Sequence, residues 1–247
     1  MSFHLTIALS LSMLFAVVGC SEGGGNSEAG STEAPTPAGA ESPVTLDTLA
    51  ILLDPGHTEW SRQSPPLWRA RFETSKGDFD VEVRREAAPL GSDRFYNLVR
   101  LGYYNDTRFH RVREEYIAQF GLHGNPEVNR AWLDRQLPDD PPGGTNVRGT
   151  LAFAMSLEPN TRNTQIYINL ADNTRNDAEP FSVFGSVVEG MEVVDRLFAG
   201  YGEESGSGVR HGLQGPIIEG GNAYLDEEFP QLDQIHRALL LEGNAHP

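Results

Sequence analysis

This chain lacks the residue patterns that mark a disulfide, a cysteine-based or HExxH metal site, or a serine hydrolase. There is one cysteine, Cys20, so an internal disulfide and a two-cysteine metal site are both excluded. The seven histidines are scattered, without a pair at the HExxH spacing of a metal site, and the GxSxG sequence of a serine hydrolase is absent. His57 follows Asp54-Pro55-Gly56 and is interpreted as a surface turn residue. We therefore expect no metal site, and a hydrolase is disfavoured.

The single cysteine lies at the end of an export signal. Residues 5–18 form an apolar run that is too short to span a bilayer as a stable anchor. The run ends in Val17-Val18-Gly19-Cys20, and small residues just before a cysteine resemble the lipobox of bacterial lipoproteins. That resemblance implies a signal peptide over 1–19 and a membrane anchor through a lipid on Cys20. Because no Lys or Arg precedes the apolar run, an ordinary cleaved signal is the alternative.

The segment after the cysteine is predicted to be a flexible tether. Residues 20–44 are dominated by Gly, Ser, Ala, Pro, Thr and Glu, which cannot bury a core. The formal net charge of the chain is −16, so its surface repels phosphate backbones and nucleic acid is not an expected partner. We expect an exported protein of the periplasm or cell envelope, tethered to a membrane.

From about Trp68 the sequence pattern indicates a folded, β-rich domain. Two runs that alternate at period two, 69–74 and 79–84, predict a β-hairpin. Apolar residues at helical spacing predict helices, and residues 125–146, with little periodicity, are predicted to be a long surface loop. The predicted helices cover 88–101, 191–198 and 229–241. Further short strands are predicted at 109–112, 116–121, 151–155, 165–170 and 183–188.

Short motifs in this region resemble, in order, those of the cyclophilin-type peptidyl-prolyl cis/trans isomerases. The match runs from about residue 69 to about 222, and it implies a mostly β fold, a closed eight-stranded antiparallel barrel capped by two helices. We divide the chain accordingly into an N-terminal extension (45–67), an isomerase domain (68–222) and a C-terminal helical extension (223–247). Leu52, Leu53 and Trp60 of the N-terminal extension are expected to cover an edge or end of the barrel. The matching motifs are Phe109–Val112, Gln119–Gly121, Arg148–Ala154, Pro159–Thr161, Thr164–Ile168 and Val183–Met191.

The resemblance implies a reaction that needs no nucleophile, metal or cofactor. Rotation about a peptide bond is opposed by a barrier of about 18–20 kcal/mol, because the nitrogen lone pair is delocalised. In an Xaa-Pro bond the two isomers are close in energy, and a donor to the twisted amide nitrogen would stabilise the transition state. The resemblance assigns this donor to Arg111, and it assigns to Gln119 and Gln165 hydrogen bonds to the substrate backbone and support for Arg111.

A proline slot is implied beside this arginine. Its expected walls are Tyr116, Ile117, Ala154 and Tyr167, and Met155 falls where the family has an Asn that contacts substrate through its backbone. Alternation along a strand would place Phe109 on the same face as Arg111, and Phe109 is included among the substrate-binding residues. Phe181 stands where the family often has a His.

The sequence departs from the family in the loop before the last motif, and this leaves alternatives open. Residues 172–177 lack the large aromatic that the family often has there, and one residue is inserted between Ala154 and Pro159. We expect a monomeric isomerase that acts on Pro-containing polypeptides and assists the folding of exported proteins. The alternatives are a non-catalytic module that binds Pro-containing segments, and a structural envelope lipoprotein.

Overall fold

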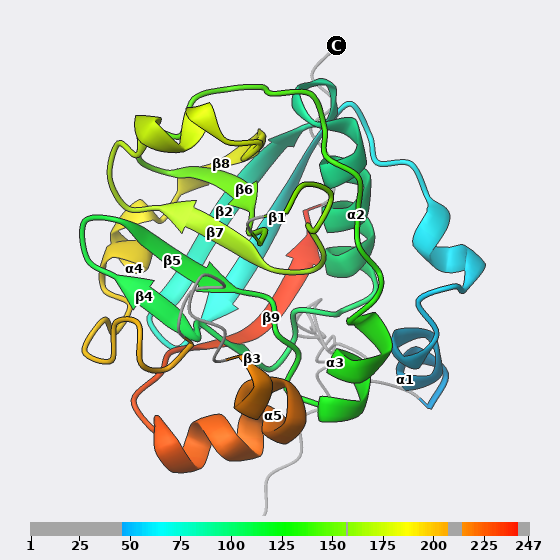
Figure 1. Cartoon of the computed structure of the whole chain (residues 1–247), viewed down its shortest axis with the longest axis vertical. Helices are drawn as coiled ribbons and strands as arrows, with labels where there is room; N and C mark the ends of the chain where they lie inside the picture. Colours follow the sequence, from blue (N-terminus) through cyan, green and yellow to red (C-terminus); the bar gives the residue numbers. More distant parts are fainter. Residues whose placement is uncertain (1–45, 157, 207–213, 242–247) are drawn as a thin grey trace, which may run out of the picture. The chain divides into compact units, whose positions relative to one another are not determined.

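A nine-stranded antiparallel sheet dominates the computed structural model, which describes residues 46–156, 158–206 and 214–241 (Figure 1). The strand order is β3-β9-β1-β2-β8-β6-β7-β5-β4. β3 and β4 lie at opposite ends of this order, yet only Phe109 and His110 separate them in the chain. The sheet therefore curls, which confirms the predicted mostly β, antiparallel fold. It has nine strands rather than the predicted eight, and in the described part of the chain no strand pairing joins β3 to β4 to close the barrel. The strands are β1 (Leu67–Thr74), β2 (Gly77–Arg84), β3 (Thr107–Arg108), β4 (Arg111–Arg113), β5 (Ile117–Phe120), β6 (Thr150–Phe153), β7 (Ile166–Asn169), β8 (Val183–Glu189) and β9 (Gln234–Leu240).

Short helices surround this sheet. Helix α2 packs beside strands β9 and β8, and its position agrees with the helix predicted over 88–101. The helix predicted over 191–198 is present but ends early, at Asp195. The helices are α1 (Leu46–Leu53), α2 (Pro89–Arg100), α3 (Pro126–Trp132), α4 (Met191–Asp195) and α5 (Gly215–Glu228), with 3-10 turns η1 (Thr58–Ser61), η2 (Arg85–Ala87) and η3 (Thr174–Ala178).

The predicted hairpin of β1 and β2 is confirmed, and its turn is closed by a threonine. Thr74 Oγ1 donates to the Gly77 carbonyl (2.6 Å) and accepts from the Lys76 amide (3.1 Å). Gly77 has a φ of 117°, a conformation that disfavours a side chain. On both strands alternate residues face inward and are buried, as Phe72 and Val81 are.

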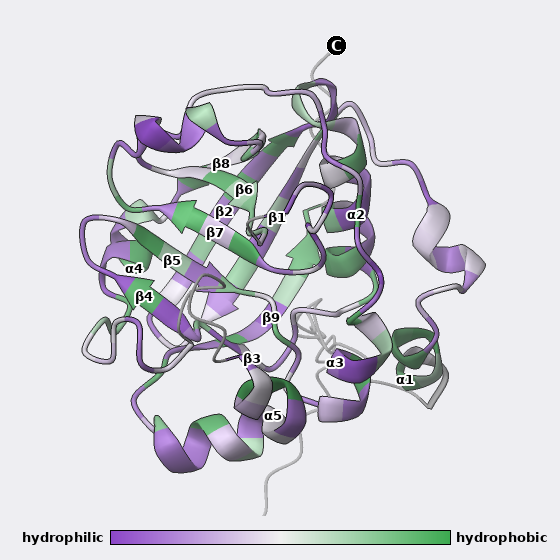
Figure 2. Ribbon diagram, viewed as in Figure 1, coloured by the Kyte–Doolittle hydropathy of each residue, from purple (hydrophilic) through white to green (hydrophobic). Residues whose placement is uncertain are grey.

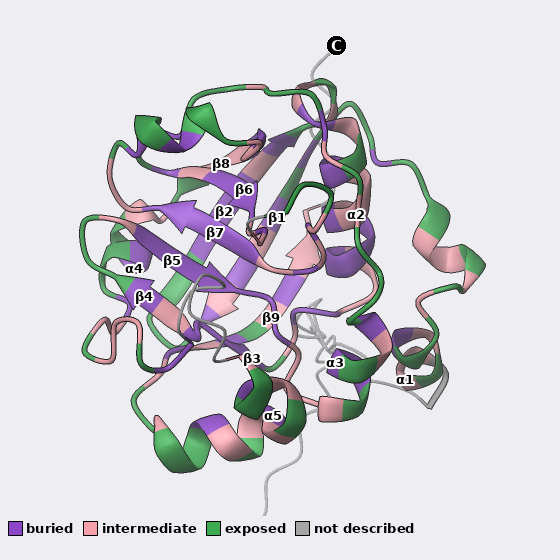
Figure 3. Cartoon of the chain, viewed as in Figure 1, coloured by how far each residue is buried: buried purple, intermediate pink, exposed green. Residues whose placement is uncertain are grey.

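Aromatic rings fill the space between the sheet and α2. Phe72 stacks on Phe79 at a centroid distance of 5.0 Å, and Phe95 of α2 lies 5.1 Å from Phe184 of β8. All four side chains are at most 1% exposed. Figures 2 and 3 show apolar, buried residues concentrated on the strands, while α5 is of mixed polarity and largely open to solvent. This buried layer fixes the sheet that carries the site.

The C-terminal segment departs from its prediction. Residues 229–241 were predicted to be a helix, but β9 lies there, paired to β1 (Phe72 opposite Ala238). The register shifts in this pair, so Ile235 and Ala238 both point inward although they are three residues apart. The helix was predicted from the spacing of Phe229, Leu232, Ile235 and Leu239, but Phe229 and Leu232 precede β9, so this pattern combined residues of a turn with residues of a strand. The predicted helical extension is wrong for this part: helix α5 precedes it, and β9 completes the sheet.

The loop predicted over 125–146 contains helix α3. The Asn125 side chain caps it by accepting from the Glu127 amide (2.8 Å), and Val128 and Trp132 are buried. Helical spacing of these two apolar residues is the signal that the prolines obscured. The prediction of a loop without a helix is wrong here.

The N-terminal extension packs on helices rather than on an edge of the sheet. Trp132 Nε1 donates to the carbonyl of Leu52 (2.9 Å), and the Trp60 ring meets Trp132 edge-on at 4.7 Å. Leu53 is 37% exposed. The predicted barrel cover is therefore replaced by packing of α1 and η1 against α3 and α2.

The export signal, Cys20 and the tether lie outside the described residues. Within the described ranges, no helix combines the length and the hydrophobicity needed to cross a bilayer.

A buried carboxylate ties the loop after α3 to the start of α2. Ala88, at the N-cap of α2, provides no side-chain hydrogen bond. Asp140 replaces it: its two oxygens accept from the Leu90 amide (2.9 Å) and the Gly91 amide (2.8 Å). The same carboxylate accepts from Arg162 Nη1 (2.9 Å), and both side chains are 1% exposed. Asp140 thus serves both the helix N-terminus and a buried guanidinium.

We expect Asp140→Ala to lower the free energy of unfolding by about 3 kcal/mol, because it removes the nearer of the two carboxylates beside the buried Arg162 charge and leaves only Asp139, at 3.4 Å. Urea denaturation followed by circular dichroism measures the change. The matched control is Asp134→Ala, an exposed aspartate of the same segment, which should change stability by less than about 0.5 kcal/mol. Equal stability of the two variants would contradict the assigned role of Asp140.

Candidate active site

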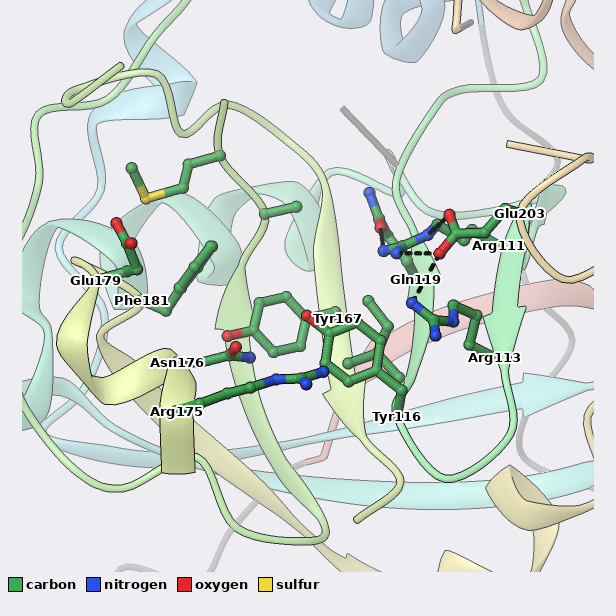
Figure 4. A pocket seen from close by; sticks show the side chains of 13 residues that line it. Arg111, Arg113, Tyr116, Gln119, Tyr167, Arg175, Asn176, Glu179, Phe181 and Glu203 are labelled. Atoms are coloured by element: carbon green, nitrogen blue, oxygen red, sulfur yellow. Dashed lines mark hydrogen bonds and ion pairs between the residues drawn. The ribbon is translucent and has the colours of Figure 1, made fainter. Parts of the chain in front are cut away.

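A cleft of about 440 Å³ opens where β4, β5 and β7 meet the loops that follow β6 and β7 (Figure 4). It brings together most of the side chains that the sequence analysis selected, from segments far apart in the chain. Its lining consists of Arg111, Arg113, Tyr116, Ile117, Gln119, Ala154, Met155, Tyr167, Arg175, Asn176, Glu179, Phe181 and Glu203.

Strand register positions Arg111. In the antiparallel ladder Arg111 of β4 lies opposite Gln119 of β5, and Gln119 lies opposite Tyr167 of β7. Arg111 Nη1 donates to Gln119 Oε1 (2.9 Å). The three residues therefore form one row across the strands, with the arginine at its end.

Glu203 is the residue of this site that the sequence analysis missed. Arg111 Nε and Nη2 each donate to one Glu203 carboxylate oxygen, both at 2.7 Å, and Arg113 Nη1 lies 3.1 Å from the same group. Glu203 stands outside every matching motif, in a Gly-, Glu- and Ser-rich stretch, so no sequence signal marked it. Ser205 Oγ donates to the His110 carbonyl (2.9 Å) and fastens this stretch to the chain beside Arg111.

These contacts fix the plane of the Arg111 guanidinium. Its side chain is only 11% exposed, whereas that of Glu203 is 35% exposed. A guanidinium has five N–H donors, and the bonds to Gln119 and Glu203 use three. In Figure 4 the Glu203 carboxylate lies on the opposite side of the guanidinium from Tyr167. Two donors thus remain for a substrate while the arginine stays in place.

The two predicted glutamines have different positions. Gln119 lines the cleft, whereas Gln165, which was also predicted to bind the substrate backbone, does not. Gln119 Nε2 donates to Gln165 Oε1 (2.8 Å), and Gln165 Nε2 donates to Gln214 Oε1 (2.9 Å). Gln165 lines a neighbouring cleft of about 220 Å³, together with Ala154 and Met155 among others. Its place in the row supports Gln119 and, through it, Arg111.

An apolar cluster separate from the main core forms the wall beside Arg111. Tyr167 and Phe181 meet edge-to-face at a centroid distance of 5.7 Å, and Ile117, Tyr116 and Ala154 join them. Tyr167 is 3% exposed, and its hydroxyl donates to Asn146 Oδ1 (2.8 Å). Burial raises the pKa of Tyr167, so this hydroxyl stays protonated. Every predicted wall residue lines the cleft, as do Met155 and Phe181.

Phe109, like Gln165, is a predicted substrate-binding residue that does not line the cleft. It is wholly buried and packs against Phe120 at 5.4 Å in the main core. The strand is interrupted at Phe109 and His110, so alternation does not carry across to Arg111. His110 is also wholly buried, and burial, followed by the charge of Arg111, lowers the pKa of His110 to about 4. It is therefore neutral near pH 7.

The loop without an aromatic residue places a cation at the rim of the cleft. The Arg175 guanidinium of η3 lies 4.8 Å from the centroid of the Tyr116 ring, within the range of a cation–π contact. Asn146 anchors this segment, because its amide and its side-chain nitrogen both donate to Asp177 Oδ1 (2.9 and 2.8 Å).

The comparisons with known proteins agree with this geometry. The family model of the cyclophilin type peptidyl-prolyl cis-trans isomerases matches residues 69–210. A peptidyl-prolyl cis-trans isomerase from Acinetobacter baylyi is 34% identical over 131 residues, which cover 51% of this chain and 69% of the relative. Peptidyl-prolyl cis-trans isomerase B from Escherichia coli strain K12 is 33% identical over 137 residues, which cover 51% of this chain and 81% of that protein.

A solved structure supports the fold. The crystal structure of a cyclophilin type peptidyl-prolyl cis-trans isomerase from Cryptosporidium parvum matches with a TM-score of 0.53 at 20% identity, covering 72% of this chain and 99% of that one. The family match spans β1 to β8 and includes the Arg111 cleft. The resemblance found in the sequence is thus confirmed, and this chain belongs to the cyclophilin-type peptidyl-prolyl cis/trans isomerases.

Proposed function

We propose that this isomerase acts on Xaa-Pro bonds of exported or envelope proteins and assists their folding, with Arg111 as the donor that meets the rotating bond. The observation that carries the proposal is the position of the Arg111 guanidinium at the edge of an apolar cluster that is separate from the core. Such a cluster, open on one side, suits a pyrrolidine ring, and the guanidinium suits the amide beside it.

The rate enhancement would come from binding the twisted amide more tightly than the planar one. As the bond rotates, the proline nitrogen regains its lone pair and becomes a hydrogen-bond acceptor. Arg111 is permanently charged and is held by Gln119 and Glu203, so its remaining donors need no reorganisation at that moment. No step requires a proton to be transferred, which is consistent with the neutral, buried His110.

Tyr167, Phe181 and Ile117 would hold the proline ring. They supply apolar surface on one side of the cleft, and Tyr167 is fixed by its bond to Asn146. A second structure of the Cryptosporidium parvum relative was determined in the presence of the dipeptide Ala-Pro, and a Pro-containing segment is the ligand we propose for this cleft. Catalysis then requires that the bound proline ring places the preceding peptide bond within hydrogen-bond distance of Arg111.

The proposed location rests on the N-terminal sequence. The apolar run, the small residues before Cys20 and the polar tether together favour export and lipid attachment to a membrane. The domain would then meet proteins that fold after export, where proline isomerisation takes tens to hundreds of seconds without a catalyst.

We expect Arg111→Ala to lower kcat/KM by about 100- to 1000-fold, the range found when one preorganised donor is removed. NMR exchange between the cis and trans forms of an Ala-Pro peptide measures the rate without a coupling protease. Arg111→Lys keeps the positive charge but loses the planar set of N–H donors, and it should retain part of the activity. The control is Arg69→Ala, an arginine of β1 that is paired to Glu82 outside the cleft. Equal turnover by the wild type and Arg111→Ala would remove Arg111 from the mechanism.

We expect Glu203→Gln to lower kcat by about three- to tenfold with little change in KM. The amide can accept one bond from the guanidinium but cannot hold both Nε and Nη2, so Arg111 would lose its fixed plane. The matched control is Glu204→Gln, an exposed glutamate next to it in the same turn. An increase in kcat would instead indicate that Glu203 obstructs the arginine.

We expect Cys20→Ser to move the protein from the membrane fraction to the soluble fraction of a bacterial host. Acyl chains bury many methylene groups, each worth about 0.8 kcal/mol, and a serine cannot receive them through a thioether. Fractionation together with labelling by a radioactive fatty acid provides the measurement, with Ser21→Ala as the control. A wild-type protein that is soluble and unlabelled would contradict the lipoprotein assignment.

A further inference from the structure

Three guanidinium groups surround the ring of Tyr116 at the rim of the cleft. The guanidinium carbons of Arg175, Arg113 and Arg111 lie 4.8, 5.0 and 5.8 Å from its centroid. Arg111 and Arg113 come from β4, and Arg175 reaches the ring from η3 on the other side of the cleft (Figure 4). A ring with its negative face toward cations explains how like charges are held so close together.

These cations differ in their partners. Arg111 and Arg113 share the carboxylate of Glu203, which shows that a carboxylate fits against this group of guanidiniums. Arg175 is exposed, and among the described residues no carboxylate oxygen lies within 4.0 Å of it. Acidic residues outnumber basic ones in this chain, 35 to 19, so an arginine that forms no ion pair with a described residue is unexpected. Arg175 therefore has a charge available to a ligand.

The distance between Arg175 and Arg111 limits where an acidic group of the substrate can lie relative to the proline. Arg111 and Arg175 both contact one ring, so their guanidinium carbons are within about 11 Å of each other. An extended chain advances about 3.3 Å per residue, so a peptide whose proline amide meets Arg111 reaches Arg175 within about three residues. The exposed Glu179 lies at the other end of the cleft, beside Phe181, and would repel an acid placed there (Figure 4).

We propose that Arg175, together with Arg113, forms an anion-binding subsite that selects substrates carrying Asp or Glu within three residues of the proline. This inference rests on the proposed function, because it assumes that the proline occupies the slot beside Arg111. Arg175 then determines specificity and takes no part in bond rotation. The chemical class of the preferred substrate is an acidic Pro-containing segment.

The competing explanation is that Arg175 only packs against Tyr116. In that case its loss would weaken the wall of the cleft for every substrate alike. Selection for an acid predicts a loss confined to acidic peptides, together with sensitivity to salt, because exposed charges are screened over about 10 Å at 0.1 M ionic strength.

The test uses the full chain and Ala-rich peptides with one proline. Glu, Gln or Lys is placed at each position from three residues before the proline to three after it, and kcat/KM is measured by NMR exchange. At the preferred position we expect the Glu peptide to exceed the Gln peptide by about three- to fivefold, the scale of an exposed ion pair, with Lys lowest. Arg175→Gln should abolish the preference, Arg175→Lys should keep most of it, and 0.5 M NaCl should reduce it. The control is Arg84→Gln, an exposed arginine of β2 that lies outside the lining of the cleft.

Equal kcat/KM for the Glu, Gln and Lys peptides at every position would overturn the proposal. So would a preference that survives Arg175→Gln, or an equal loss for all three peptides in that variant. If no peptide is isomerised, the proposed function fails. Dissociation constants from NMR titration of the same peptides then test the anion-binding subsite independently of turnover. Tighter binding of Glu peptides that Arg175→Gln removes would still support it, and equal binding would still overturn it.

Discussion

The bidentate ion pair between Arg111 and Glu203 is the interaction on which this site depends. It joins a strand at one end of the curled sheet to a turn 92 residues later in the chain. On its own, an arginine at the end of a sheet would sample many rotamers, and ordering it costs up to about 2 kcal/mol. The hydrogen bonds to Glu203 and Gln119 offset this loss of side-chain entropy in the folded state, before a substrate binds. The arrangement can therefore present a donor in a fixed plane, as a reaction driven by differential binding requires.

Buried polar groups extend this constraint away from the arginine. Asn146 is completely buried, and it accepts from the Tyr167 hydroxyl while it donates to Asp177. One side chain thus fixes the aromatic wall of the slot and the segment that carries Arg175. Asn169 of β7 also donates to the Asn146 side-chain oxygen (3.2 Å), so hydrogen bonds through Asn146 join strand β7 to the η3 segment.

The sequence alone predicted the features that depend on local pattern or on matching motifs. The β1–β2 hairpin and helix α2 follow from alternation and helical spacing, whereas Arg111, Gln119 and the slot residues follow from the motifs that resemble the family. Features that depend on tertiary register could not be predicted. The apolar spacing over 229–239 combines a turn with strand β9 and imitates a helix, and the break in the strand at His110 leaves Phe109 in the core. Glu203 lies near Arg111 only because the chain returns there after α4, which no local signal indicates.

The charge of the chain and the charge of the cleft act over different distances. With a net charge of −16 the molecule repels an acidic segment from afar, whereas the guanidiniums around Tyr116 attract it only at close range. Salt screens the long-range repulsion first, so raising the ionic strength from a low value should speed the encounter. The contact with Arg175 weakens at higher salt as well, and turnover of acidic substrates should then pass through a maximum. A neutral substrate experiences neither effect, so the shape of the salt dependence reports on the local cations independently of the absolute rate.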